Sequence, residues 1–395
     1  MIGFDEAWAL AASAGRLLGI ERVPLRRAHG RVLAEAVIAQ VQSPPADVSA
    51  MDGYAVRDGD LAALPATLPI AGESFAGRPF AGDLPPGSCL RIFTGAQVPA
   101  GADRVVVQET VERDDDRARF RSPLSTARHI RRAGSDFARG EQLLAPGMVL
   151  SARALVAAAG ADLDRLAVAR QPRILLLSTG DELVEPGTAR NSKHAIPESV
   201  SFGVAALAEE WGGHCEGAIR LPDDLQVMEE AAPGALAQAD LVVVTGGASV
   251  GEKDFAKTMF AASGLELIFS KVAIKPGKPV WLGRARGRLV LGLPGNPTSA
   301  LVTARLFLAP LLCALTGRDP ADALAWRGMA LGHELEATGD RETFSRGFAK
   351  GDTVHLFGHQ DSSAQHVLAK ADLLVRRPPG RDPIASGSRV DVLDF

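Results

Sequence analysis

Two lysines lie three residues apart in the segment Lys275-Pro-Gly-Lys278-Pro279. The prolines and the glycine restrict its backbone, so little entropy is lost when both ammonium groups are ordered around one ligand. Two positive charges presented together suit a small anion. A solvated lysine turn is the simpler alternative, but exposed turns seldom carry this much backbone restraint. We therefore predict an anion site at Lys275 and Lys278.

A glycine-rich segment, Gly246-Gly-Ala-Ser-Val-Gly251, follows the apolar run at 241–245. Glycines allow backbone N–H groups to approach a phosphate or a pterin closely. Such turns are common after strands, and the loop alone is a weak signal. Polar and charged side chains in and after the loop favour a ligand site. The candidate binding residues are Gly246, Gly247, Ser249 and Gly251.

A third loop lies between the apolar run at 289–293 and a helical pattern that continues to about residue 315. Asn296 suits the N-cap of this helix and Pro297 its first position. The first turn of a helix offers free N–H groups and a positive dipole end to an anion. A capped helix without any ligand explains the pattern equally well. The candidate binding residues are Pro294, Gly295, Asn296 and Pro297.

Carboxylates follow the expected strands: Asp181 and Glu182 after one, Asp223 and Asp224 after another, and Asp254 after the glycine loop. Mg²⁺ binds one or two carboxylates together with waters and phosphate oxygens. Each acid alone is more simply a solvated loop residue. Their joint placement at strand ends favours a metal site.

Two further motifs lie in a region rich in short strands, Ser49-Ala-Met-Asp52-Gly-Tyr54-Ala-Val-Arg57 and Thr94-Gly-Ala-Gln-Val-Pro99. Asp-Gly is a common tight turn, which is the plain interpretation of Asp52. A cleft shared between this region and the lysine and glycine loops, in one chain or across a dimer, would explain both motifs.

The framework of residues 171–318 decides whether these loops can meet. Apolar runs at 174–177, 241–245 and 289–293 alternate with helical patterns at 200–211 and 225–239. This order predicts a parallel sheet covered by helices on both faces. Ligands bind such sheets at the carboxyl ends of the strands, where all of these loops are expected.

The rest of the chain divides into domains by its composition and by the positions of its proline and glycine residues. We expect an N-terminal helical domain from 1–43 and 138–170, a β-rich inserted domain at 44–137 and a C-terminal β domain at 319–395. A first helix is expected from Phe4 to Leu18. The predicted fold class is multidomain α/β plus β, with an α/β/α three-layer central domain.

Composition narrows the functional classes. A length of 395 residues suits about two to four domains, and a formal net charge of −4 argues against a general nucleic-acid binder. The three cysteines are far apart and favour a reducing compartment. The N-terminus has no signal-peptide pattern, and the richest apolar segment, 300–315, contains Arg305 and Pro310. We expect a cytoplasmic enzyme without a membrane span.

Taken together, these motifs resemble the MoeA family, which includes the E domain of gephyrin and the plant Cnx E domains. The matching segments, in family order, are Ser49–Arg57, Arg91–Gly95, Ser178–Leu183, Gly246–Asp254, Ile274–Pro279 and Gly292–Pro297. They span the chain, and their joint occurrence makes the resemblance highly specific.

The resemblance implies an elongated homodimer of four-domain subunits with a molybdopterin-binding central domain. The implied enzyme is a molybdopterin molybdenumtransferase. It takes adenylylated molybdopterin and molybdate, hydrolyses the adenylate with Mg²⁺, and leaves molybdenum on the dithiolene sulfurs. A molybdopterin adenylyltransferase and acceptor molybdoenzymes are the implied partners, and neither nucleic acid nor membrane is involved.

The resemblance also implies roles for individual residues. Catalytic and metal-binding roles fall on Glu182, Asp223 and Asp254, and catalytic roles on Asp52 and Thr94, which the partner subunit contributes to the cleft. The lysine pair, Lys275 and Lys278, holds molybdate or phosphate. Asp136 matches a further family acid, and Arg346 resembles a family arginine near the oxyanion.

Two departures from the family pattern support alternative functions. Val200 stands where the family usually has an asparagine, and His366-Val367 aligns with a serine pair that helps hold molybdate in relatives. His366 could donate a hydrogen bond instead, although a surface histidine is simpler. A catalytically weakened scaffold or pterin-binding paralogue is one alternative. An enzyme similar to molybdopterin adenylyltransferase is another, supported by the α/β domain alone.

Overall fold

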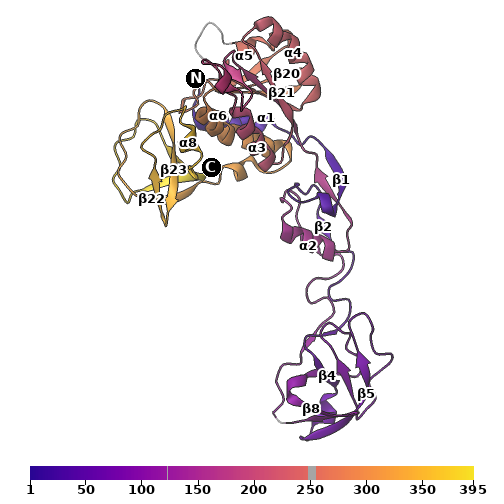
Figure 1. Cartoon of the computed structure of the whole chain (residues 1–395). Helices are drawn as coiled ribbons and strands as arrows, with labels where there is room; N and C mark the ends of the chain where they lie inside the picture. Colours follow the sequence, from indigo (N-terminus) through magenta and orange to yellow (C-terminus); the bar gives the residue numbers. More distant parts are fainter. Residues whose placement is uncertain (122, 248–254) are drawn as a thin grey trace.

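The computed structural model describes residues 1–121, 123–247 and 255–395. The chain is elongated: the central α/β domain and a C-terminal β domain lie together at one end, and a β-rich domain lies at the other, joined by a small middle module (Figure 1).

The central domain is built on a six-stranded sheet in the order β16-β13-β17-β21-β20-β18. The strands are β13 (Arg173–Thr179), β16 (His214–Leu221), β17 (Leu241–Thr245), β18 (Glu266–Ser270), β20 (Trp281–Ala285) and β21 (Arg288–Leu293). The four strands from β16 to β21 are parallel, as predicted, but β20 runs antiparallel to both of its neighbours, β21 and β18. Only Arg286 and Gly287 connect β20 to β21, both with positive φ, and so short a turn forms a hairpin and not a crossover.

Helices cover both faces of this sheet because alternate strand residues point to opposite sides. Ile174 and Leu176 pack with α1, α3 and the helix at 297–315, whereas Leu175 and Leu177 pack with α4 and α5. The helices are α1 (Phe4–Ala14), α3 (Val200–Glu210), α4 (Leu225–Gln238), α5 (Phe255–Thr258), α6 (Pro297–Thr303) and α7 (Ala309–Leu315), with a π-helical segment η6 (Ala304–Leu308) between the last two. The three-layer arrangement was predicted from the sequence.

The first helix differs from its prediction in its length and in the domain with which it packs. It ends at Ala14, four residues before the expected Leu18, and the next residue is Gly15. A Cβ on Gly15 would lie 2.6 Å from that of Ala314, so the chain passes very close to α7 here. Phe4, with an exposed fraction of 2%, belongs to the core of the central domain. By packing, α1 therefore belongs with the central domain, although we expected it in the N-terminal one.

The apolar segment around 300–315 belongs to one long helix. The helix Pro297–Leu315 is long and apolar enough, by length and composition, to cross a membrane. In the fold, 94% of its apolar window is buried, and it lies in the core of the central domain. Among the described residues it is the single helix that meets this test, and its burial identifies it as a core helix.

The middle module and the β-rich domain are connected by paired strands. In the module, β1 (Ile20–Pro24) pairs with β12 (Arg165–Ala169) and β2 (Val37–Ile38) with β11 (Gln142–Leu144), beside α2 (Ala152–Gly160). Beyond it, β3 (Val48–Ser49) pairs with β10 (Ile130–Arg131). The β-rich domain has the sheet β7-β4-β6-β5-β9-β8. Its strands are β4 (Gly53–Val56), β5 (Ala66–Ser74), β6 (Cys89–Ile92), β7 (Arg104–Val107), β8 (Val111–Asp114) and β9 (Arg117–Phe120).

The C-terminal domain is a closed barrel, because β23 pairs with both β24 and β25 and so completes the ring β23-β24-β22-β26-β25. Its elements are β22 (Arg327–Leu331), β23 (Glu342–Lys350), β24 (Thr353–Leu356), α8 (Gln365–Leu368), β25 (Leu373–Arg377) and β26 (Arg389–Asp394). A short strand of the lysine segment, β19 (Ile274–Lys275), pairs with the start of β23. The lysine segment is therefore hydrogen-bonded to the barrel.

A buried aspartate joins the middle module to the central sheet. Asp240, with 1% of its side chain exposed, forms ion pairs with Arg170 at 2.9 Å, Arg288 at 3.0 Å and Arg173 at 3.5 Å. Burial raises the pKa of Asp240, but hydrogen bonds from Arg170 and from the N–H of Arg173 outweigh it, and the pKa is lowered overall. Since Arg170 directly follows β12, this cluster anchors the module where it leaves the sheet.

We predict that Asp240→Ala lowers the free energy of unfolding by about 2–3 kcal/mol at pH 7, because three partly exposed arginines lose a buried partner. The folded-state pKa lies below the ordinary 3.8, so this contribution is full above that value and is lost as the pH falls through the folded pKa. The difference between the two proteins should therefore shrink below about pH 3.8.

Urea unfolding followed by tryptophan fluorescence measures this effect. No tryptophan lies in the β-rich domain, so the signal comes from the rest of the chain. Asp340→Ala is the control, because that side chain is 90% exposed and pairs only at 3.8 Å with its neighbour Arg341. If Asp240→Ala lowers the free energy of unfolding no more than the control does, the anchoring role is contradicted.

Candidate functional site

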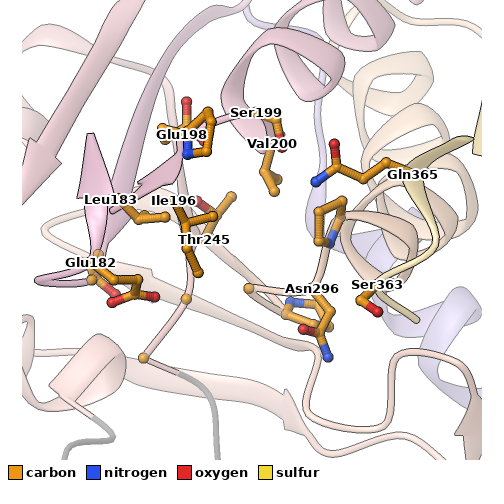
Figure 2. Close-up of a pocket in the computed structure, with 18 of the residues that line it drawn as sticks. Glu182, Leu183, Ile196, Glu198, Ser199, Val200, Thr245, Asn296, Ser363 and Gln365 are labelled. Carbon is orange, nitrogen blue, oxygen red and sulfur yellow. The ribbon is translucent and has the colours of Figure 1, made fainter. Parts of the chain in front are cut away.

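A cavity of about 570 Å³ lies at the carboxyl ends of β13, β17 and β21, as expected for a parallel sheet. We call it the acidic cavity, because three of its described lining residues are carboxylates and none is a lysine or an arginine. Figure 2 shows Glu182 at one end and Asn296, Ser363 and Gln365 at the other. The polar and charged lining side chains are Thr179, Glu182, Glu198, Ser199, Asp223, Thr245, Asn296, Ser363 and Gln365.

Two glycines bring the loops of this cavity into contact. A Cβ on Gly295 would lie 3.2 Å from the Cα of Gly246, and a Cβ on Gly246 only 2.5 Å from the carbonyl oxygen of Thr179. Gly246 also has a φ of 89°, which favours glycine. Three strand-end loops therefore meet through their backbones at this cavity.

Two of the predicted metal-binding acids line the same cavity. Glu182 follows β13 and Asp223 follows β16. The backbone N–H of Asp223 donates a hydrogen bond to Oδ1 of Asp181 at 2.9 Å, and this bond holds the two loops together. Asp224 is used differently, because its side chain caps α4 by accepting from the N–H groups of Gln226 and Val227. Among the described residues no group of three metal-binding side chains occurs, but Mg²⁺ binds one or two carboxylates together with phosphate oxygens and waters.

One wall of the acidic cavity is apolar. Val200 lines it with Leu183, Ile196 and Pro197, which lie on the paired segments β14 (Leu183–Val184) and β15 (Ile196–Pro197). Glu198 is also part of the lining, but its carboxylate accepts from both the N–H and the hydroxyl of Ser201 and so holds the start of α3. This wall suits the flat face of a ring.

A second cavity, of about 440 Å³, adjoins the first, and Pro279 lines both. We call it the basic cavity, because its described lining has three cations, Lys275, Lys278 and Arg341, and one carboxylate, Asp361. Neither lysine has an ion pair with another described residue. Hydroxyl groups complete the lining, from Ser299, Thr343, Ser345 and Ser362. Positive charge and hydroxyl donors are a suitable environment for a tetrahedral oxyanion.

The lysine segment is held by close packing. Gly277, with a φ of 103°, faces α6, where a Cβ would lie 2.2 Å from Cγ2 of Thr303. Only glycine fits this approach, and the two lysines on either side stay exposed at the mouth of the cavity. The backbone restraint expected from the sequence is thus supplied partly by contact with the helix.

The predicted oxyanion arginine lies behind the basic cavity and does not line it. Arg346 has an exposed fraction of 1%. Its guanidinium donates to the carbonyl oxygen of Asp361 at 3.0 Å and to Oγ1 of Thr298 at 3.1 Å. Burial lowers its pKa and the carboxylate of Asp361 opposes this effect. Arg346 therefore holds the loop that borders the cavity.

The loop before α8 also accounts for the departure at the family's serine pair. His366 is exposed, as the simpler interpretation expected, and Val367 is buried in the barrel. Two serines stand four residues earlier, with Ser362 in the basic cavity and Ser363 in the acidic one. Ser362 thus provides a hydroxyl beside the lysines, from a position that the family's serine pair did not indicate.

Asp52 and Thr94 lie apart from both cavities of their own chain, in the β-rich domain (Figure 1). Asp52 Oδ1 accepts from the N–H and from the hydroxyl of Thr94, each at 2.7 Å. These two bonds, with a smaller contribution from Arg91, lower the pKa of Asp52. Asp136, exposed on the connection to the middle module, also lies outside both cavities.

The remaining candidates divide into two groups. The loop residues Gly246, Gly247, Pro294, Gly295, Asn296 and Pro297 all line the acidic cavity. Asn296 occupies the N-cap position of α6 and Pro297 the first helical one, but the Asn296 side chain makes no cap bond and donates to Ser362 instead. Ser249, Gly251 and Asp254 lie outside the described residues.

Comparisons with known proteins agree with this geometry. Three family models match: "MoeA N-terminal region (domain I and II)" over 2–161, "Probable molybdopterin binding domain" over 175–314 and "MoeA C-terminal region (domain IV)" over 329–395. The chain is 37% identical over 383 residues to the molybdopterin molybdenumtransferase of Haemophilus influenzae, covering 95% of the chain and 94% of that protein. The chain belongs to the MoeA family.

Further relatives of this MoeA-family chain agree. Molybdopterin molybdenumtransferase 2 of Mycobacterium tuberculosis is 34% identical over 386 residues, with 94% of each chain covered. The crystal structure of a molybdopterin biosynthesis moeA protein from Pyrococcus horikoshii OT3 matches with a TM-score of 0.84 at 25% identity, covering 100% of both chains. The predicted family, the transferase class and the α/β plus β fold are confirmed.

Several lining residues were missed because they come from distant segments. Ser362, Ser363 and Gln365 reach the cavities only because the barrel packs on the central domain, and no local pattern marks them. Thr179 belonged to the matching segment Ser178–Leu183, but no role was assigned to it. Its buried hydroxyl has no hydrogen-bond partner among the described residues, and it lines the acidic cavity.

We predict that Thr94→Val raises the pKa of Asp52 toward its ordinary value, because one of the two hydrogen bonds that stabilise its ionised form is lost. The N–H of residue 94 remains as a donor, so part of the lowering should persist. Carboxyl-carbon NMR titration measures the shift. Thr94→Ser, which keeps the hydroxyl, is the control, and an unchanged Asp52 pKa in Thr94→Val contradicts the assignment.

Proposed function

We propose that this MoeA-family chain inserts molybdenum from molybdate into adenylylated molybdopterin and hydrolyses the adenylate, giving molybdenum cofactor and AMP. The observation that carries the proposal is the pair of neighbouring cavities of opposite character, acidic and basic, that share a wall at the carboxyl edge of the sheet. A reaction that joins a metal oxyanion to a phosphorylated organic ligand needs two such compartments side by side.

The basic cavity is assigned to molybdate, a tetrahedral dianion. Lys275 and Lys278 supply positive charge at its mouth, and Arg341 adds a third cation. The acidic cavity is assigned to the pterin, with Val200 and Ile196 against the ring and the backbone of Gly246 and Gly295 toward its phosphate.

Mg²⁺ fits the donor set at one end of the acidic cavity. Glu182 and Asp223 supply two carboxylates from adjacent strand ends, and Asp254 is a further candidate from the glycine loop. When bound there, the cation neutralises phosphate charge at the bond to be broken. The residues of the chain orient the adenylate between this end and the basic cavity.

The proposed chemistry balances without an oxidant or a reductant. The oxygen of water bonds to one phosphorus of the anhydride, the P–O bond to the other phosphate breaks, and AMP and the pterin phosphate are released with a proton. The two dithiolene sulfurs then bond to molybdenum. One molybdate oxygen leaves as water with both thiol protons, and molybdenum keeps its oxidation state.

We assign Asp52 and Thr94 to the cleft of the other subunit in a homodimer. Asp52 is ionised and held toward Thr94, yet the cavities of its own chain lie at the far end of the molecule. A closed two-fold arrangement would bring it to the partner's cleft and make two equal sites. A cytoplasmic location, an adenylylating partner and acceptor molybdoenzymes belong to the same proposal.

One observation favours the second candidate, a pterin-binding paralogue with weak turnover. Val200 presents an apolar side chain where an amide is expected, so one polar contact to the ligand is missing. The adenylyltransferase-like alternative would predict adenylyl transfer from ATP to molybdopterin.

We predict AMP release when the protein receives adenylylated molybdopterin, Mg²⁺ and molybdate, and a fall to background after removal of the cation with EDTA, because phosphate charge is then unshielded. Chromatography of AMP is the measurement, with and without molybdate. Pterin binding without molybdate-dependent AMP release supports the paralogue, and formation of the adenylate from ATP supports the adenylyltransferase-like alternative.

We further predict that Asp52→Ala and Lys275→Ala are each inactive, and that a heterodimer of the two recovers about half of the turnover per dimer, because one of its two clefts is then intact. Differently tagged copies allow the heterodimer to be purified. The matched control is a heterodimer of Asp52→Ala with Thr94→Ala, which should stay inactive because each cleft lacks one of the pair. No recovery in the first mixture rules out cross-subunit clefts.

A further inference from the structure

The wall between the two cavities is one loop of the barrel. Gln360, Asp361 and Ser362 line the basic cavity, whereas Ser363 and Gln365 line the acidic one. Successive residues of this loop therefore face different compartments. A ligand in either cavity touches the same short segment, which we call the wall loop (residues 360–365).

The wall loop is held firmly from behind. The guanidinium of Arg346 donates to the carbonyl oxygens of Asp361 and Ala364, at 3.0 and 3.5 Å. Gln360 forms a reciprocal pair with the backbone of Arg346, accepting its N–H at 3.0 Å and donating to its carbonyl oxygen at 2.9 Å. With its main chain held in this way, the loop keeps its side chains aimed at the cavities.

A hydrogen bond crosses the wall from one cavity to the other. Nδ2 of Asn296, which lines the acidic cavity, donates to Oγ of Ser362, which lines the basic cavity, at 3.1 Å. The N–H of Thr298 also donates to the carbonyl oxygen of Ser362, at 3.1 Å. Because Oγ of Ser362 already accepts a bond from Asn296, its own O–H is free to donate to an acceptor in the basic cavity.

We propose that the Ser362 hydroxyl binds the oxyanion in the basic cavity and that the Asn296–Ser362 hydrogen bond couples this binding to ligand occupancy of the acidic cavity. The inference rests on the proposed function, because it takes molybdate as the oxyanion and the pterin as the second ligand. It assigns to Ser362 the hydroxyl contribution that His366-Val367 cannot make.

The coupling has a direct physical cause. An amide donor polarises the hydroxyl that accepts its bond, and that hydroxyl becomes a stronger donor to the anion beyond it. A pterin that contacts Asn296 changes the position or strength of this donor and so changes the affinity of Ser362 for the oxyanion. By linkage, molybdate then changes the affinity for the pterin by the same factor.

Isothermal titration of molybdate into the full-length protein, alone and saturated with molybdopterin, tests the proposal. Molybdopterin is used without its adenylate, so that no anhydride is hydrolysed, and with both sulfurs alkylated, so that they cannot bond to molybdenum. We expect the molybdate Kd to differ about fivefold or more between the two states of the unsubstituted protein. Ser362→Ala should weaken molybdate binding about tenfold, as expected for one hydrogen bond to a charged group.

Two variants separate the hydroxyl from the coupling. Ser362→Thr keeps the hydroxyl and should bind molybdate nearly as well as the unsubstituted protein. Asn296→Ala should weaken molybdate binding less than Ser362→Ala does, but it should lose the difference between the two states. Ser386→Ala, a serine of the same barrel that lines neither cavity, should behave as the unsubstituted protein.

The outcomes distinguish this inference from the proposed function. Equal molybdate affinity in Ser362→Ala and the unsubstituted protein overturns the assignment of Ser362, while the proposed function stands. Equal Kd values with and without molybdopterin in the unsubstituted protein overturn the coupling. No molybdate binding by the unsubstituted protein overturns both the inference and the oxyanion site of the proposed function.

Discussion

The parallel pairing of β13, β17 and β21 is the constraint on which the site depends. It ends three strands at one edge, and the loops that follow then meet through backbone atoms. Gly246 and Gly295 show how tight this meeting is, since a side chain on Gly295 would press against the main chain of its neighbour. A larger side chain at either glycine would separate the loops that line the acidic cavity.

The barrel turns this edge into two compartments. Its wall loop closes the side that the central domain leaves open, and β23 pairs with the lysine segment next to it. Arg346 connects the barrel to the central domain, because its guanidinium donates hydrogen bonds to the wall loop and to Thr298 at the start of α6. Most charged side chains of both cavities belong to the central domain, and the barrel adds Arg341, Asp361 and the loop that separates the two compartments.

Local patterns in the sequence predicted much of the central domain. Apolar runs located β13, β17 and β21, and the start of the following helix was placed from Asn296 as N-cap and Pro297 as first residue. The antiparallel edge, the packing of Phe4 and the closure of the barrel were not predicted, because they depend on contacts between distant segments. The same limit explains Ser362. A serine in a loop gives no signal until the fold brings Asn296 to it.

The pairing of β3 with β10 places the two ends of the β-rich domain side by side, with Val48 opposite Arg131 and Ser49 opposite Ile130. The chain leaves and returns through adjacent antiparallel strands, which a short turn is able to connect. Such a segment is a self-contained insert, and evolution is able to gain, exchange or delete it as a module while the rest of the molecule keeps its hydrogen bonding.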